Sequence, residues 1–182
     1  MRTDSSISAA SHGGPPSLAR QRGLTLAELL VAIAVMALLF GWAIPSFQAL
    51  SARHEVSAEI LRLKTALALA RNTAIARRTT VTVCPSHDGI GCNNDDWTAP
   101  LMVIQGRAEG GNIGSDEVLR ILDDSRVASV SYRQDNRPVR YGALGRPAGH
   151  NGTFHICGRH DAGARVIVSN FGRVRVDDTP TC

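Results

Sequence analysis

The stretch RQRGLTLAELLVAIAVMALLF, residues 20–40, places a long apolar run directly behind two arginines. Between Leu24 and Leu50 the only charged residue is Glu28. Basic residues ahead of an apolar run are typical of an export signal whose N-terminal side stays in the cytoplasm. Past the apolar run the helical pattern continues through residues 51–78, where a cleaved signal would give way to a polar chain. We therefore predict that the apolar segment is kept as a membrane span.

The single carboxylate in this run needs an explanation, because an ionised side chain inside a membrane costs roughly 2.5–3.5 kcal/mol on insertion. One alternative is that Glu28 lies at the membrane surface, where its side chain reaches water. The other is that a cation offsets the cost, which makes Glu28 a functional residue.

The segment RGLTLAELLVAIAVMALL, residues 22–39, resembles the type IV prepilin signature. The matching features are a short basic leader that ends in Gly23 and a Thr-Leu-x-Glu-Leu-Leu start to a long apolar helix. The resemblance implies that a prepilin peptidase cuts between Gly23 and Leu24 and methylates the new N-terminus. It also implies that Glu28 pairs with the N-terminal ammonium of a neighbouring pilin during assembly, so the missing cation is on another chain.

These features divide the chain into three parts. Residues 1–23 are expected to be a cleaved leader, residues 24–52 the transmembrane and filament-core half of the N-terminal helix, and residues 53–182 a periplasmic, pilus-exposed domain. The protein would then be a single-pass inner-membrane protein that is incorporated into a pilus on the cell surface. Its expected partners are other pilins, the prepilin peptidase and the inner membrane.

The pattern from Leu24 to about Arg78 predicts one long helix, which Gly41 and Pro45 are expected to interrupt and bend. Its second half carries an apolar stripe at spacings of three and four, suited to packing on a sheet. The stripe consists of Val56, Ile60, Leu63, Leu67, Ala70 and Ala74. The arginines of this helix are expected to be largely solvated: Arg53, Arg62, Arg71, Arg77 and Arg78.

Beyond Thr79 the pattern changes to short β-rich runs separated by loops of Gly, Asp, Asn and Pro. The runs are TTVTVC, LMVIQ, EVLRIL, RVASVSY, TFHIC, ARVIVS and GRVRV. They predict an α+β fold in which an antiparallel sheet domain packs on the helix. Trp97 is expected to anchor a loop in the core, with nucleobase stacking as the alternative. Aromatic residues make up only 4% of the chain, so few stacking platforms are expected.

The segments VTVCPSHDGIGC, DDWTAPLMVI and FHICGRHDAGARVIVSNFGRVRV resemble the GspH/FimT group of minor pilins and pseudopilins. That group's fold, an N-terminal helix under β-sheets, agrees with the pattern. The prepilin signature and these segments together span most of the chain after the leader.

The four cysteines are even in number and all follow the apolar segment, which fits two disulfides in an oxidising periplasm. Three pairings are possible, and we favour Cys84 with Cys92 and Cys157 with Cys182. A zinc site near His87 is the rival, but the spacings contain no CxxC unit.

Charge is unevenly distributed along the domain. Residues 79–125 hold two arginines and eight acids, a net charge of −6, whereas residues 126–182 hold nine arginines and four acids, a net charge of +5. Within the basic third, Arg173 and Arg175 would lie on one face of a strand with their Cα atoms about 6.6 Å apart, close to the spacing of successive phosphates along one DNA strand. Neutralised phosphates release counterions, which favours binding. The alternatives are that the two arginines only solvate an outer face, and that the charged blocks neutralise each other.

The segment Gly172-Arg173-Val174-Arg175 resembles the GRxR motif of the FimT branch, which is linked to DNA binding in natural transformation. The resemblance implies a DNA-phosphate site that is not sequence-specific, in which Gly172 brings the backbone near the ligand. Four arginines are candidates to widen this site: Arg140, Arg146, Arg159 and Arg165. The competing hypothesis is a minor pilin or pseudopilin that primes or caps a pilus or a type II secretion pseudopilus without binding DNA.

No catalytic constellation is recognisable, so we expect no enzyme activity, no cofactor and no metal. His87 with Asp88 and His160 with Asp161 are adjacent in Gly-rich loops, where such residues usually form turns. The chain contains no nucleophile elbow, P-loop or HExxH motif.

Overall fold

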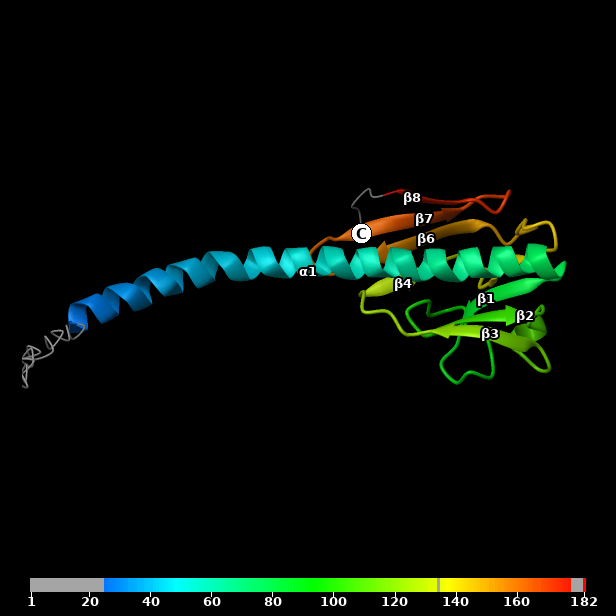
Figure 1. Cartoon of the computed structure of the whole chain (residues 1–182), viewed down its shortest axis with the longest axis horizontal. Coiled ribbons are helices and arrows are strands. Elements are labelled where there is room, and N and C mark those ends of the chain that lie inside the picture. The colour runs from blue at the N-terminus through cyan, green and yellow to red at the C-terminus, as the bar shows by residue number, and fades with distance from the viewer. Residues whose placement is uncertain (1–24, 134, 178–181) are drawn as a thin grey trace, which may run out of the picture. The chain divides into compact units, whose positions relative to one another are not determined.

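The computed structural model describes residues 25–133, 135–177 and 182 (Figure 1). Helix α1 spans Leu26–Arg77, and a 3₁₀ turn spans Glu109–Gly111. Eight strands follow the helix: β1 Val81–Pro85, β2 Leu101–Gln105, β3 Glu117–Leu122, β4 Ser129–Ser131, β5 Val139–Tyr141, β6 Gly152–Cys157, β7 Gly163–Val168 and β8 Val174–Asp177. The described residues form two compact units, with the boundary between Phe40 and Gly41. The expected leader and its cleavage site at Gly23 and Leu24 lie outside the described residues.

Helix α1 begins with a side-chain cap. The Thr25 hydroxyl oxygen accepts a hydrogen bond from the Glu28 backbone N–H at 3.2 Å, which satisfies one of the free N–H groups of the first turn. Glu28 is in that first turn, where the helix dipole favours a carboxylate. Apolar side chains from Leu26 to Phe40 are exposed within this single chain, so their partners must come from outside it. By length and composition α1 can cross a membrane.

The helix continues through Gly41 and Pro45 without a break, so the expectation that these residues interrupt it is wrong. A proline removes one backbone hydrogen bond, and in a helix of this length the remaining hydrogen bonds keep the helix continuous.

The second half of α1 packs on the strands through the expected stripe. Val56, Leu63, Leu67, Ala70 and Ala74 are buried, and Ile60 is partly buried against the same core. This confirms the amphipathic prediction. The stripe also includes residues that were not predicted: Ala52, Glu59 and Ala66.

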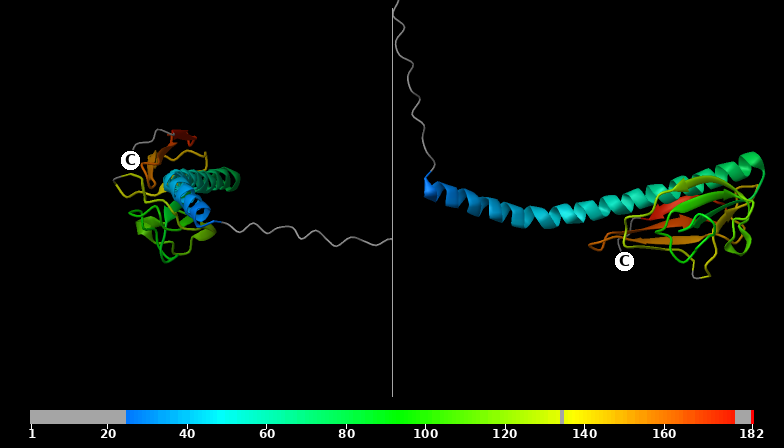
Figure 2. Two further views of the ribbon diagram at one scale, coloured as in Figure 1. Left: turned by 90° about the vertical axis from the view of Figure 1, so that its left-hand side faces the viewer. Right: turned by 90° about the horizontal axis from the view of Figure 1, so that it is seen from below.

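The strands form two antiparallel four-stranded sheets, in the orders β3-β2-β1-β5 and β4-β6-β7-β8. Figures 1 and 2 show both sheets packed along the second half of α1. One continuous core joins the helix to both sheets. All seven predicted runs contain a strand. Strand β5 was not predicted; it is three residues long and lies between Pro138 and Gly142.

Trp97 lies in this core at 1% exposure, which confirms its predicted anchoring role and excludes base stacking. Its ring meets Tyr132 edge-on at 5.2 Å and Phe154 at 4.9 Å between centroids. The Tyr132 hydroxyl donates to the backbone oxygen of His150 at 2.7 Å. Burial raises the pKa of Tyr141 to about 12.

The prediction that Arg62 is solvated is wrong, because its side chain is only 10% exposed. It pairs with the buried Glu59 at 2.8 Å. Its guanidinium also donates to three backbone oxygens, those of Trp97, Ala99 and Asp123. Arg62 therefore links α1 to the segment that precedes β2 and to the segment that follows β3.

All four cysteines form disulfides within the domain. Cys84 is bonded to Cys92 and Cys157 to Cys182, each pair with Cα atoms 5.5 Å apart. This is the favoured pairing, and it leaves no thiol for the rival zinc site.

Candidate nucleic-acid interface

A tight hairpin positions the predicted GRxR segment. Strands β7 and β8 are joined by residues 169–173. Hydrogen bonds from the Ser169 N–H to the Arg173 oxygen at 2.9 Å and from the Gly172 N–H to the Ser169 oxygen at 2.8 Å close a three-residue turn, residues 170–172, within this connection. Gly172 has φ +76°, the left-handed conformation that such loops require at their last position. The hairpin therefore fixes where Arg173 leaves the turn.

Arg173 and Arg175 are exposed, whereas the intervening and following valines, Val174 and Val176, pack against the core. This alternation places both arginines away from the core, although Arg173 precedes β8 instead of lying within it. Among the residues that the structure describes, no carboxylate pairs with either guanidinium. Both side chains are therefore available to an external anion.

Because Gly172 has no side chain, another turn of the same chain can pack directly against its backbone. A Cβ atom built on Gly172 would lie 2.1 Å from the Gly145 backbone oxygen. This contact accounts for the glycine within the chain itself, and the approach of its backbone to a ligand stays a prediction. Gly172 therefore allows the β7–β8 turn to contact the turn that contains Gly145.

Of the arginines predicted to widen the site, Arg146 lies next to the β7–β8 hairpin. Its guanidinium carbon lies 5.5 Å from the centre of the Phe171 ring in the β7–β8 loop. Arg71 of α1 donates to the backbone oxygens of Gly145 at 3.2 Å and Phe171 at 3.4 Å, which holds the two loops together. Arg71 is thus partly buried, contrary to the solvated position expected for it.

Arg165 and Arg159 are engaged by acids. Arg165 lies on β7 opposite Asp177 and pairs with it at 2.7 Å. Arg159 pairs at 2.5 Å with Glu55 of α1. It belongs to the β6–β7 turn, at the end of β7 opposite to the β7–β8 hairpin. The structure therefore does not bring Arg159 together with Arg173.

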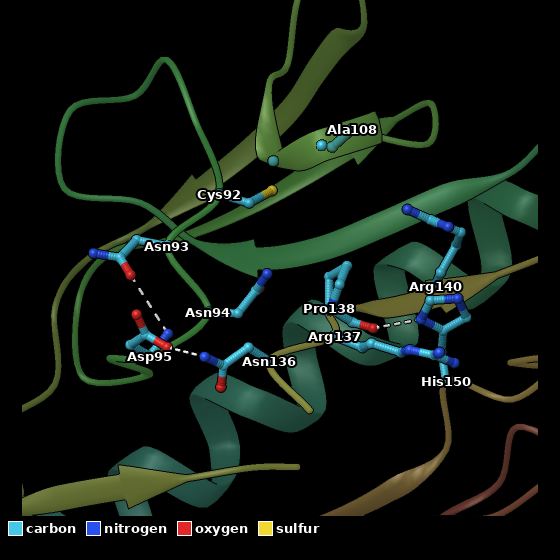
Figure 3. Close-up of a pocket in the computed structure, with 12 residues that line it drawn as sticks. Cys92, Asn93, Asn94, Asp95, Ala108, Asn136, Arg137, Pro138, Arg140 and His150 are labelled. Carbon is cyan, nitrogen blue, oxygen red and sulfur yellow. Dashed lines mark hydrogen bonds between the residues drawn. The ribbon is translucent and has the colours of Figure 1, made fainter. Parts of the chain in front are cut away.

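Arg140 lies in a separate hollow of about 610 Å³ (Figure 3). The side chain donates to the Arg107 backbone oxygen and to the Thr82 hydroxyl. Across the hollow, Asn136 bonds to Asp95, and the His150 ring bonds to the Pro138 oxygen at 2.8 Å. Most polar groups here already have partners in the chain, so this hollow is a weaker anion site than the unpaired Arg173 and Arg175.

The two His-Asp pairs form turns, as predicted. Asp88 accepts hydrogen bonds from the backbone N–H groups of Ile90 and Gly91, which lower its pKa. His160 and Asp161 both have positive φ angles, of +53° and +57°. Burial lowers the pKa of His150, which favours the neutral ring.

The contact at Gly172 gives a test of the hairpin. Gly172→Ala is expected to destabilise the domain by well over the roughly 1–2 kcal/mol that a left-handed non-glycine residue costs, because the new methyl group would also collide with the Gly145 oxygen. The matched control is Gly149→Ala, at φ +88° with no atom within 4 Å of the new Cβ. Urea unfolding of both variants measures the difference. Equal losses would contradict the close contact between the two turns.

Comparison with known proteins gives two matches along the chain. Residues 59–172 match the family described as type II transport protein GspH. Residues 18–44 match the prokaryotic N-terminal methylation motif. The GspH match ends at Gly172, so Arg173 and Arg175 lie just beyond it. No curated protein matches the chain.

The fold is similar to that of the type IV minor pilin FimU of Pseudomonas aeruginosa. Its crystal structure in space group P21 is 24% identical, has a TM-score of 0.53, and aligns over 69% of this chain and 90% of that chain. A second FimU crystal form, in space group P65, is 24% identical with a TM-score of 0.48, over 70% and 90% of the two chains. The first likeness establishes a long N-terminal helix packed on antiparallel sheets, as the sequence predicted.

Proposed function

The chain belongs to the family of the type II transport protein GspH, and we propose that within it this protein is a minor type IV pilin that binds DNA through Arg173 and Arg175. The family and the fold are structural, which agrees with the prediction that the chain is not an enzyme. The N-terminal methylation motif supports processing by a prepilin peptidase and assembly with other pilins. In this proposal the leader is residues 1–23, the membrane and filament-core half is residues 24–52, and the exposed domain is residues 53–182.

The observation that carries the DNA proposal is the pair of exposed, unpaired arginines. Arg173 and Arg175 alternate with core-packed valines, and in the described part of the chain neither has an acidic partner. Arg165, by contrast, is already paired with Asp177. A guanidinium without an internal partner can neutralise a phosphate without first breaking an ion pair.

The second candidate function is assembly: a subunit that primes or caps a pilus or a type II secretion pseudopilus without binding DNA. The GspH family match favours this candidate. So does the apolar face of α1 from Leu26 to Leu50, whose large side chains are exposed in the single chain and need protein or lipid partners.

The DNA proposal is tested on the domain from Ser51 onward, which contains every buried residue of the core and both disulfides. Arg173→Ala with Arg175→Ala is expected to weaken DNA binding similarly across sequences, because phosphate contacts carry little base information. If both contacts are made, the slope of log affinity against log salt should shrink by about 1.8 on duplex DNA or about 1.4 on single strands. Fluorescence anisotropy against salt measures this.

The control removes two other exposed cations, by Arg53→Ala with Lys64→Ala on α1. Arg62 would be unsuitable because it is buried with Glu59. Equal losses of DNA affinity in the two double variants would indicate a diffuse attraction between DNA and the positive charges of the domain. Equal losses, or a wild-type domain that fails to bind DNA at low salt, would reject the DNA proposal and leave the assembly function.

A further inference from the structure

Two turns at the end of the domain where α1 ends have the same design. One runs from Gly142 to Arg146 (Gly-Ala-Leu-Gly-Arg) and the other from Ser169 to Arg173 (Ser-Asn-Phe-Gly-Arg). In each, the first residue's N–H donates to the last residue's oxygen, at 3.0 and 2.9 Å, and the glycine N–H donates back to the first residue's oxygen at 2.8 Å. The two glycines have φ angles of +68° and +76°. We call Leu144, Arg146, Phe171 and Arg173 the twin-turn patch.

The patch is held rigidly. Arg71 hydrogen-bonds to the Gly145 and Phe171 backbone oxygens, one in each turn. The glycine contact leaves no room between the turns, since a Cβ on Gly172 would lie 2.1 Å from the Gly145 oxygen. The backbone that carries these side chains is therefore fixed by contacts within the chain before a ligand arrives, which lowers the entropy cost of binding.

The patch exposes large apolar side chains that contribute little to the fold. Leu144 is 82% exposed and Phe171 is 60% exposed. Turn positions of this kind usually carry Gly, Asn, Asp, Ser or Pro. The domain from residue 53 onward contains five aromatic residues, and the other four are buried: Trp97, Tyr132, Tyr141 and Phe154. Phe171 is thus the one aromatic residue of this domain that is not buried.

Arginines flank this ring. The Arg146 guanidinium lies over Phe171, and Arg173 follows two residues later in the chain. Among residues 25–133, 135–177 and 182, neither guanidinium has an acidic partner. An exposed ring beside unpaired arginines is the combination by which proteins bind unpaired nucleotides, since bases stack on the ring and cations meet the phosphates.

We propose that the twin-turn patch binds single-stranded DNA, with one unpaired base stacked on Phe171 and the adjoining phosphates on Arg146 and Arg173. This rests on the proposed DNA function, because Arg173 belongs to both sites. Duplex DNA keeps its bases stacked on one another, so it can use only the arginines. The site should therefore prefer a single strand to a duplex of the same sequence.

The test compares three probes on the domain from Ser51 onward: a single-stranded oligonucleotide, its duplex, and a single strand of the same length with abasic sites. The wild-type domain should bind the single strand more tightly than the other two. Phe171→Ala should weaken single-strand binding about 5- to 150-fold, the range for one base on one aromatic ring, and leave duplex binding nearly unchanged. Phe171→Leu, which keeps apolar area without a ring, should lose most of the same affinity.

Phe171→Trp supplies a second readout. It should retain single-strand binding, and its exposed indole should be quenched by the single strand and much less by the abasic strand, while the buried Trp97 should respond to neither. Thermal unfolding of each variant should match wild type, since the ring is exposed.

The outcomes separate this inference from the proposed function. Equal binding of all three probes, unchanged by Phe171→Ala, would overturn the stacking inference and leave phosphate binding by Arg173 and Arg175 intact. If no probe binds, both fail. If Phe171→Ala instead reduces incorporation into filaments while DNA binding is unchanged, the patch is a contact for another pilin and the inference is overturned.

Discussion

Glu28→Ala is expected to leave the protein in the membrane and to remove it from assembled pili. Under the proposed function, Glu28 pairs with the N-terminal ammonium of a neighbouring subunit in an environment of low dielectric. Removing one member of a buried ion pair costs about 3–5 kcal/mol, which corresponds to more than about a hundredfold in an association equilibrium. Membrane insertion should be unimpaired, because the change removes a charge from an apolar segment. Immunoblots of membrane and sheared-pilus fractions measure both quantities.

The matched control is Thr25→Ala. In the structure the Thr25 hydroxyl accepts the Glu28 N–H, so this change removes the helix cap and keeps the carboxylate. Loss of the cap costs about 1 kcal/mol of helix stability. If Thr25→Ala and Glu28→Ala reduce the pilus fraction equally, Glu28 acts through the first turn of α1. Normal recovery of Glu28→Ala in pili would reject the intersubunit pairing.

Arg62→Ala is expected to destabilise the domain strongly. It would leave the Glu59 carboxylate, which is 1% exposed, without its partner at 2.8 Å. It would also remove the donor to the Trp97, Ala99 and Asp123 backbone oxygens. We expect a loss of about 3–5 kcal/mol in the free energy of unfolding, on the order of 10–20 °C in Tm. Urea and thermal unfolding of the domain from Ser51 onward measure these values.

Two further variants test the cause of that loss. Glu59→Leu with Arg62→Met replaces both charges by apolar groups and should recover part of the stability, because no buried charge is left unpaired. Arg53→Ala, at an exposed position of the same helix, should change the free energy of unfolding by less than about 0.5 kcal/mol. If Arg62→Ala were as mild as Arg53→Ala, the pair would not secure α1 to the sheets.

The helix and most strands were predictable because they follow from local periodicity. The stripe from Val56 to Ala74 packs on the sheets as its spacing indicated, and all seven β-rich runs contain strands. The exposure of Arg173 and Arg175 also followed from alternation with valines.

The rest depends on contacts between distant segments, which periodicity does not encode. Glu59 and Arg62, three residues apart on a helix, have the spacing of a surface ion pair, and only the loops that fold over them bury the pair. Arg71 has no sequence signal for its bonds to Gly145 and Phe171. Arg159 and Arg146 are equally basic in the sequence, yet only Arg146 reaches the β7–β8 hairpin.

One feature of the twin-turn patch was readable in the sequence. The segments ALGR, residues 143–146, and NFGR, residues 170–173, repeat a large apolar residue followed by Gly-Arg. Since Gly at the third position of a three-residue hairpin loop is a known signal, both turns could have been predicted from that repeat. Their contact with each other could not, because it is made through Gly172 and the Gly145 oxygen.

DNA capture through Arg173 and Arg175 is best tested in cells that carry the Arg173→Ala, Arg175→Ala variant as their only copy. The measurement is uptake of labelled DNA per cell alongside the number of pili per cell. If the two arginines capture DNA, uptake should fall to the level of a strain that lacks the protein while pilus number stays at the wild-type value. Normal uptake, or a loss of pili that matches the loss of uptake, would contradict it.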